Sequence, residues 1–130
     1  MTTLVVDANV VFELVSAPDA VAHLSGDELV APPLLWPEVR SALHIARWRG
    51  LLADDEASIA REVLESNAFR ERRPRQLGAE AWAIADSLGW SKTYDAEYLA
   101  LASLLKIPIA TFDQRVINAA ERLGVSAHRF

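Results

Sequence analysis

The chain has 130 residues, of which 52 % are hydrophobic, a formal net charge of −5 and no cysteine. This length suits one compact domain over residues 1–130, and this hydrophobic content excludes intrinsic disorder. The lack of cysteine excludes a disulfide framework and any thiolate metal site.

The N-terminal segment does not look like an export signal. Its apolar run, Leu4-Val5-Val6, is interrupted by Asp7, and no basic segment precedes it. No apolar stretch in the chain approaches the roughly 18 residues that a membrane span needs. We therefore expect a cytoplasmic protein that makes no contact with membranes.

Hydrophobic periodicity predicts strands that alternate with helices. In the first half, the pattern predicts a strand at residues 3–6, a helix at 10–15 with Asn9 as its N-cap, a short helix at 18–24, a strand at 28–31 and a long helix at 34–49. In the second half, it predicts a helix at 54–65, an irregular or short-strand segment at 67–75, helices at 77–88 and 91–106, the latter capped by Ser91, a strand at 108–112, a helix at 116–123 and an edge strand at 125–129. This alternation implies crossover connections, so the expected fold is α/β with a parallel sheet.

Two predicted strands are followed by aspartate. Asp7 comes directly after the first strand, and Asp113 follows the strand at 108–112. Ligands of parallel sheets bind beyond the carboxyl ends of the strands, where these two carboxylates are expected to lie near each other. Either residue could instead serve only as the cap of the helix that follows it. For Asp7, the availability of Asn9 as a cap favours the site.

Two further acids lie on the apolar sides of predicted helices. At 100° per residue, Glu38 falls between Ala42 and Ile45, and Asp95 lies on the same side as Leu99. A solvated carboxylate would be expected on the opposite side of its helix. Two alternatives remain open: a buried salt bridge for Glu38, and stabilisation of Asp95 by the dipole of its helix.

The four carboxylates together predict a cation site. Clustered carboxylates are costly unless cations neutralise them, and oxygen-only ligands suit Mg²⁺ or Mn²⁺. Bound cations would also reverse the local sign of the charge, so the net charge does not exclude nucleic acid. One short segment is strongly basic and would either steer an RNA backbone or form a solvated loop: Arg70, Arg72, Arg73 and Arg75.

Four segments resemble the PIN-domain family, and specifically its VapC-type toxin branch. Their order and spacing match the family over essentially the whole chain: Leu4-Val5-Val6-Asp7-Ala8-Asn9, Trp36-Pro37-Glu38-Val39, Thr93-Tyr94-Asp95-Ala96-Glu97-Tyr98-Leu99-Ala100-Leu101-Ala102 and Ala110-Thr111-Phe112-Asp113. The Tyr-Asp-Ala segment and the Thr-x-Asp are the most specific of these.

The resemblance implies a three-layer α/β/α fold around a central parallel sheet of about four to five strands. It implies a Mg²⁺-dependent ribonuclease, with Mn²⁺ able to substitute, that is the toxin of a type II toxin–antitoxin pair. Its partners would be RNA, a small cognate antitoxin and a second copy of the chain in a homodimer.

The resemblance also implies roles for individual residues. By resemblance, the catalytic residues are Asp7, Glu38, Asp95 and Asp113. The three aspartates would be metal ligands, and Glu38 would bind the metal directly or through water. Asn9 and Thr111 match the family's supporting polar positions. The chain departs from the pattern after Asp113, where many relatives carry another acid and this chain has Gln114-Arg115-Val116. The number of metal ions, one or two, therefore stays open.

Other classes of protein fit less well. A phospho-acceptor domain needs an acidic pair after the first strand and a lysine after a late one, but Ala8 follows Asp7 and Lys106 precedes its strand. A catalytically silent PIN scaffold, or an RNA-processing nuclease that is not a toxin, has the same sequence pattern. An RNA cleavage assay with Mg²⁺ and with EDTA separates these possibilities.

Overall fold

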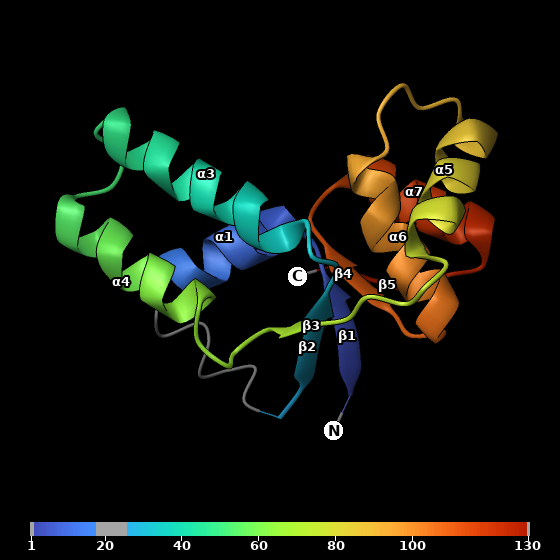
Figure 1. Ribbon diagram of the computed structural model, residues 1–130, viewed down its shortest axis with the longest axis horizontal. Helices are drawn as coiled ribbons and strands as arrows, with labels where there is room; N and C mark the ends of the chain where they lie inside the picture. Colours follow the sequence, from blue (N-terminus) through green and yellow to red (C-terminus); the bar gives the residue numbers. More distant parts are fainter. Residues whose placement is uncertain (1, 18–25, 130) are drawn as a thin grey trace.

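The computed structural model describes residues 2–17 and 26–129 (Figure 1). The short helix predicted at residues 18–24 lies outside this part of the chain. Within it, no helix is long and apolar enough to cross a membrane.

The centre of the structure is a five-stranded parallel sheet with the order β3-β2-β1-β4-β5. β1 (Thr3–Val6) is the middle strand, and β2 (Glu28–Ala31) and β4 (Ile109–Thr111) pair with it on either side. The edges are β3 (Arg70–Glu71) and β5 (Ala127–Arg129). The predicted parallel sheet is confirmed, and the basic segment contributes a short strand to it.

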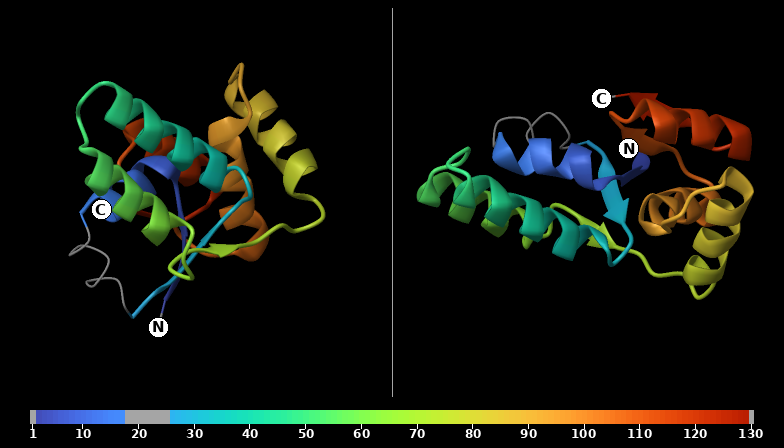
Figure 2. Two further views of the ribbon diagram at one scale, coloured as in Figure 1. Left: turned by 60° about the vertical axis from the view of Figure 1, so that its left-hand side comes forward. Right: turned by 90° about the horizontal axis from the view of Figure 1, so that it is seen from above.

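The helices cover both faces of the sheet, as Figure 2 shows. One layer holds α1 (Ala8–Ser16), α3 (Leu35–Trp48) and α4 (Asp54–Leu64). The other holds α5 (Leu77–Leu88), α6 (Tyr94–Leu105) and α7 (Gln114–Leu123). From β1 the chain moves to one edge through β2 and β3, then returns past β1 to β4 and β5. Because crossovers are right-handed, the reversal puts the later helices on the opposite face. The expected three-layer α/β/α fold is confirmed.

Three helix starts differ from the predictions by two or more residues: α1 begins at Ala8 rather than at 10, α6 at Tyr94 rather than at 91, and α7 at Gln114 rather than at 116. α1 begins at Ala8, and Asp7 is its N-cap, with the Val10 N–H donating to Asp7 Oδ1 at 3.0 Å. The prediction that Asn9 caps this helix is wrong, because Asp7 already has the extended backbone of a cap (φ −87°, ψ 171°) and Asn9 lies inside the first turn. α6 begins at Tyr94, so the prediction that Ser91 caps it is also wrong.

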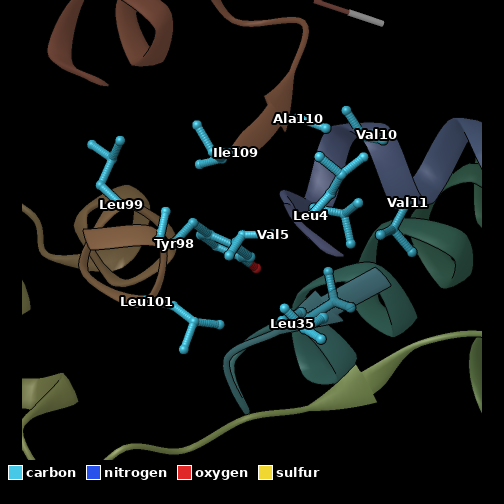
Figure 3. Close-up of a cluster of buried hydrophobic side chains, with 14 of the residues drawn as sticks. Leu4, Val5, Val10, Val11, Leu35, Tyr98, Leu99, Leu101, Ile109 and Ala110 are labelled. Carbon is cyan, nitrogen blue, oxygen red and sulfur yellow. The ribbon is translucent and has the colours of Figure 1, made fainter. Parts of the chain in front are cut away.

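The core lies on both sides of β1. All three residues that follow Thr3 in this strand are buried. Figure 3 shows side chains of α6 approaching from one side of the strand and side chains of α1 and α3 from the other: Tyr98, Leu99 and Leu101, and Val10, Val11 and Leu35. A strand that is buried on both faces has no room for polar alternation, which explains the apolar run that follows Thr3.

The first prediction tests this packing with a pair of leucines. Leu35 is fully buried, whereas Leu51, which follows α3, is 75 % exposed. Leu35→Ala should lower the free energy of unfolding by roughly 2–5 kcal/mol, because it removes buried methyl groups and leaves a cavity. The matched change Leu51→Ala should alter it by less than about 0.5 kcal/mol. Urea denaturation measures both, and equal losses for the two variants would contradict the described core.

Candidate active site

The candidate site lies at the carboxyl ends of β1 and β4, the two neighbouring strands at which the chain changes direction across the sheet. Such a point is where ligands bind in open α/β sheets. The register pairs Val6 with Ala110, and the Asp7 N–H donates to the Ala110 carbonyl at 3.4 Å. Asp7 therefore lies beside Thr111 just where both strands end.

Thr111 links the two aspartates that follow these strands. Its hydroxyl donates to Asp7 Oδ2 and accepts from the Asp113 N–H at 3.0 Å. The hydroxyl is buried, since Thr111 has no exposed surface. One side chain thus fixes the carboxylate of Asp7 and the backbone at Asp113, and brings the two predicted site residues together.

Asp7 is a buried carboxyl group, with only 7 % of its surface exposed. Burial raises its pKa above the ordinary value of 3.8, and the nearby charges of Asp95 and Asp113 raise it further. The hydrogen bonds from Thr111 and from the Val10 N–H oppose this shift. Asp7 therefore combines the two roles that the sequence presented as alternatives: it caps α1, and it stands among other acids.

Glu38 reaches the site from the first turn of α3. The indole N–H of Trp36 donates to the Leu64 carbonyl of α4 at 3.1 Å, which anchors this turn. The Tyr98 hydroxyl of α6 donates to Glu38 Oε1 at 2.8 Å. Burial raises the pKa of Glu38, and the charges of Asp95, Glu97 and Asp7 add to the shift. The buried salt bridge considered for Glu38 is replaced by a neutral donor.

Tyr98 is well suited to this role, because it remains protonated. Burial raises the pKa of its hydroxyl far above the ordinary value, and the charge of Glu38 and the hydrogen bond to it act in the same direction. Tyr98 lies in the segment that carries the family resemblance, and the sequence indicated no partner for it. Glu97 of the same helix is partly buried, and its charge also raises the pKa of Glu38.

Asp95, in the first turn of α6, is paired with an arginine that was not predicted from the sequence as a site residue. Arg115 Nη2 donates to Asp95 Oδ2 and lies 3.8 Å from Asp113 Oδ2. The guanidinium carbon stands 4.7 Å from the centre of the Trp90 ring, within the range of a cation–π contact. The available signal was its position, since Arg115 follows Asp113 where many relatives carry an acid.

The donor chemistry of these residues fits a hard divalent cation. The side chains that gather here offer carboxylate oxygens and no nitrogen or sulfur ligand. In residues 2–17 and 26–129, however, no three His, Cys, Asp or Glu side chains lie close enough together to hold a metal ion. Arg115 contacts two of the three predicted ligands, Asp95 and Asp113.

The other predicted residues, apart from Thr111, are exposed. Asn9 is exposed in the first turn of α1. Arg70 is on the edge strand β3, which β2 separates from β1, and it pairs with Glu28 at 3.0 Å. The remaining three arginines are exposed and follow this strand: Arg72, Arg73 and Arg75.

A cavity of about 500 Å³ adjoins the carboxylates. Glu38, Asp95 and Arg115 contribute to its wall. Residues of the loop between α5 and α6 and the start of α6 complete it, among them Trp90, Lys92 and Tyr94. Because Tyr94 and Lys92 are exposed, an aromatic ring and a positive charge are available next to the acids.

The chain belongs to the PIN-domain family, whose model matches residues 4–122. PIN domains are generally nucleases, and PIN nucleases typically use divalent metals. The chain has no significant match among curated protein sequences.

Similar solved structures agree on the fold. PAE2754 from Pyrobaculum aerophilum is 22 % identical, with a TM-score of 0.70 over 97 % of this chain and 90 % of that one. VapBC-1 from nontypeable Haemophilus influenzae is 16 % identical, with a TM-score of 0.68 over 98 % of both chains. FitAcB from Neisseria gonorrhoeae is 18 % identical, with a TM-score of 0.63 over 95 % of both.

The second prediction concerns the stability of the metal-free protein. Because the pKa of Asp7 is raised on folding, the folded state binds more protons than the unfolded chain from about pH 3.8 up to the raised value. Stability should therefore fall as the pH rises through this window. Asparagine does not titrate in this range and still caps a helix. Asp7→Asn should therefore be at least as stable as the wild type at neutral pH, and any gain in stability should shrink towards pH 3.8.

Melting curves in EDTA between acid and neutral pH measure this difference. Asp86→Asn, at an exposed position of α5, is the matched control, and its melting temperature should equal that of the wild type at acid and at neutral pH. A variant of Asp7 that is less stable than the wild type at neutral pH would show that the negative charge stabilises the fold, contrary to the burial argument.

Proposed function

We propose that this protein is a metal-dependent endoribonuclease of the VapC toxin type, which hydrolyses RNA phosphodiester bonds. One observation carries the proposal: Thr111 ties Asp7 to Asp113 at the carboxyl ends of the two central strands, with Asp95 and Glu38 close enough for their charges to affect one another. This arrangement occurs in a chain of the PIN-domain family.

Asp7, Asp95 and Asp113 would hold the Mg²⁺ ion, with Glu38 acting directly or through water, and Mn²⁺ would substitute. When bound, such an ion supplies Lewis-acid chemistry, activating water and neutralising the charge that develops on phosphorus. The support is the oxygen-only donor set and the burial of Asp7, which makes a cationic partner favourable.

The residues around the acids would keep the carboxylates in place. Thr111 and the Val10 N–H occupy one oxygen each of Asp7, so its orientation is set before any ion arrives. Tyr98 holds Glu38 through Oε1 and does not compete for a proton, because its own pKa is raised far above neutral pH. Preorganised ligands of this kind lower the reorganisation needed during reaction.

The RNA backbone would meet positive charge on two sides of the acids. Three arginines follow the carboxyl end of β3: Arg72, Arg73 and Arg75. Because the sheet is parallel, this strand ends on the same side of the sheet as β1 and β4, at whose carboxyl ends the site lies. Lys92 and Tyr94 in the adjoining cavity provide an ammonium group and an exposed ring. Arginine and lysine contacts with phosphates position a nucleic acid without reading its sequence. Arg70 is the weakest candidate of its segment, because Glu28 already pairs with it.

The third prediction is metal-dependent cleavage. Purified protein should cut a structured RNA in Mg²⁺ or Mn²⁺ and stop in EDTA. Asp7→Asn and Asp113→Asn should each lower the rate by at least about 100-fold, since even indirect supports of metal ligands cost up to that amount. Asp86→Asn should cleave at the wild-type rate. Undiminished cleavage in EDTA would contradict the mechanism, and a folded protein that cuts no RNA would be a silent scaffold.

An antitoxin partner is the second part of the proposal. The similar structures include VapBC and FitAB complexes, which supports a protein partner of the antitoxin kind. Large apolar side chains are exposed near the C-terminal end of α3, where a partner would cover them: Ile45, Trp48 at 85 % exposure and Leu51. We place this pair in the cytoplasm and infer that the nuclease is a homodimer.

The fourth prediction tests the toxin assignment. Expression in bacteria should arrest growth, and a small protein encoded beside this one should reverse the arrest when co-expressed. Asp7→Asn should be harmless at the same expression level, because it retains the fold and loses a metal ligand. Growth curves with matched immunoblots measure the effect. Harmless expression of protein that is active in vitro would instead indicate an RNA-processing nuclease.

A further inference from the structure

Arg115 is the point at which three separate parts of the structure meet. Its guanidinium pairs with Asp95 on α6, lies 3.8 Å from the carboxylate of Asp113 at the end of β4, and covers the ring of Trp90 between α5 and α6. Arg115 itself stands near the start of α7, where its backbone N–H donates to Asp113 Oδ1 at 2.9 Å. The side chain therefore lies against the carboxylates of Asp95 and Asp113.

This placement has an electrostatic consequence. Asp95 and Asp113 carry like charges in a site that also includes Asp7, and a guanidinium between them offsets the repulsion. Trp90 favours the same location, because a cation over an indole face is stabilised. The pair is half exposed, at 54 % for Arg115 and 45 % for Asp95, so solvent weakens the attraction and an exchange of cations remains feasible.

We propose that Arg115 is an internal counter-cation, which occupies the Asp95 and Asp113 side of the carboxylate cluster in the absence of a divalent ion and must yield these oxygens when an ion binds. Arg115 thereby sets the affinity of the site for divalent ions. The inference rests on the proposed function only in taking Asp95 and Asp113 as ligands. Arg115 is a positioning residue that acts through these two acids.

The surroundings provide space for the exchange. The cavity of about 500 Å³ beside Asp95 includes Arg115 and Trp90 in its wall. A second cavity of about 160 Å³ is lined by the same two residues and by Arg122 of α7. A guanidinium that leaves the carboxylates can remain on the indole and turn into either space.

Titration calorimetry of Mn²⁺ binding to the metal-free protein, at low ionic strength, tests the inference without RNA. Arg115→Gln removes the competing charge and should bind Mn²⁺ about tenfold more tightly, because a unit charge no longer repels the ion at close range. Arg115→Lys keeps the charge and should return most of the way to the wild-type affinity. Arg122→Gln removes the same charge two turns along the helix and is the matched control, with an expected change of less than about twofold, since charges in solvent are largely screened.

Melting temperatures give a second measurement. In EDTA, Arg115→Gln should melt below the wild type because its acids lose their counter-charge, and saturating Mn²⁺ should close this gap. Arg122→Gln should follow the wild type in both buffers. This readout also shows whether each variant is folded.

The outcomes separate the inference from the proposed function. Equal Mn²⁺ affinities for Arg115→Gln and the wild type would overturn the inference while leaving metal-dependent cleavage intact. Tighter binding by Arg115→Gln in a protein that cuts no RNA would support the inference and overturn the nuclease. Failure of every folded variant to bind Mn²⁺ would overturn both.

Discussion

The hydrogen bond from the Thr111 hydroxyl to the Asp7 carboxylate joins the ends of the two central strands, and the rest of the site is arranged around it. Asp7 is buried and already serves as the cap of α1, so its position is determined by the sheet and by a helix at once. Through the same hydroxyl, Thr111 also holds the backbone of Asp113. A single buried side chain therefore sets the spacing of two acids that are more than 100 residues apart, since Asp7 and Thr111 are separated by 104 positions.

The acids of the site are stabilised in three different ways. Asp7 relies on hydrogen bonds from a backbone N–H and a hydroxyl, Glu38 on a neutral tyrosine, and Asp95 on the guanidinium of Arg115. Only the last of these supplies a full positive charge. The buried acids consequently keep raised pKa values, and the side of the cluster that faces the cavity is where charge can be exchanged. The neutral supports, Thr111 and Tyr98, are thus buried, whereas the cationic partner, Arg115, is exposed.

The solved relatives show how little of the sequence this fold requires. Chains with 16–22 % identity to this one share its architecture with TM-scores of 0.63–0.70. In this chain, β1 is covered on both faces and the chain reverses direction between β1 and β4, which places the ends of these strands at the crevice.

The sequence by itself determined the class of fold, and it singled out the four acids as candidate site residues. Periodicity of 2.0 or 3.6 residues is a local property, so it predicted the strands that end at Asp7 and before Asp113, the helices that carry Glu38 and Asp95, and the parallel sheet. The tertiary structure decided which group each acid contacts. Tyr98 meets Glu38 from 60 positions away, Arg115 meets Asp95 from 20, and Asp7 took the capping role that Asn9 was expected to fill. Hydrogen bonds and ion pairs depend on distances between atoms on different elements, and periodicity along one element contains no information about those distances.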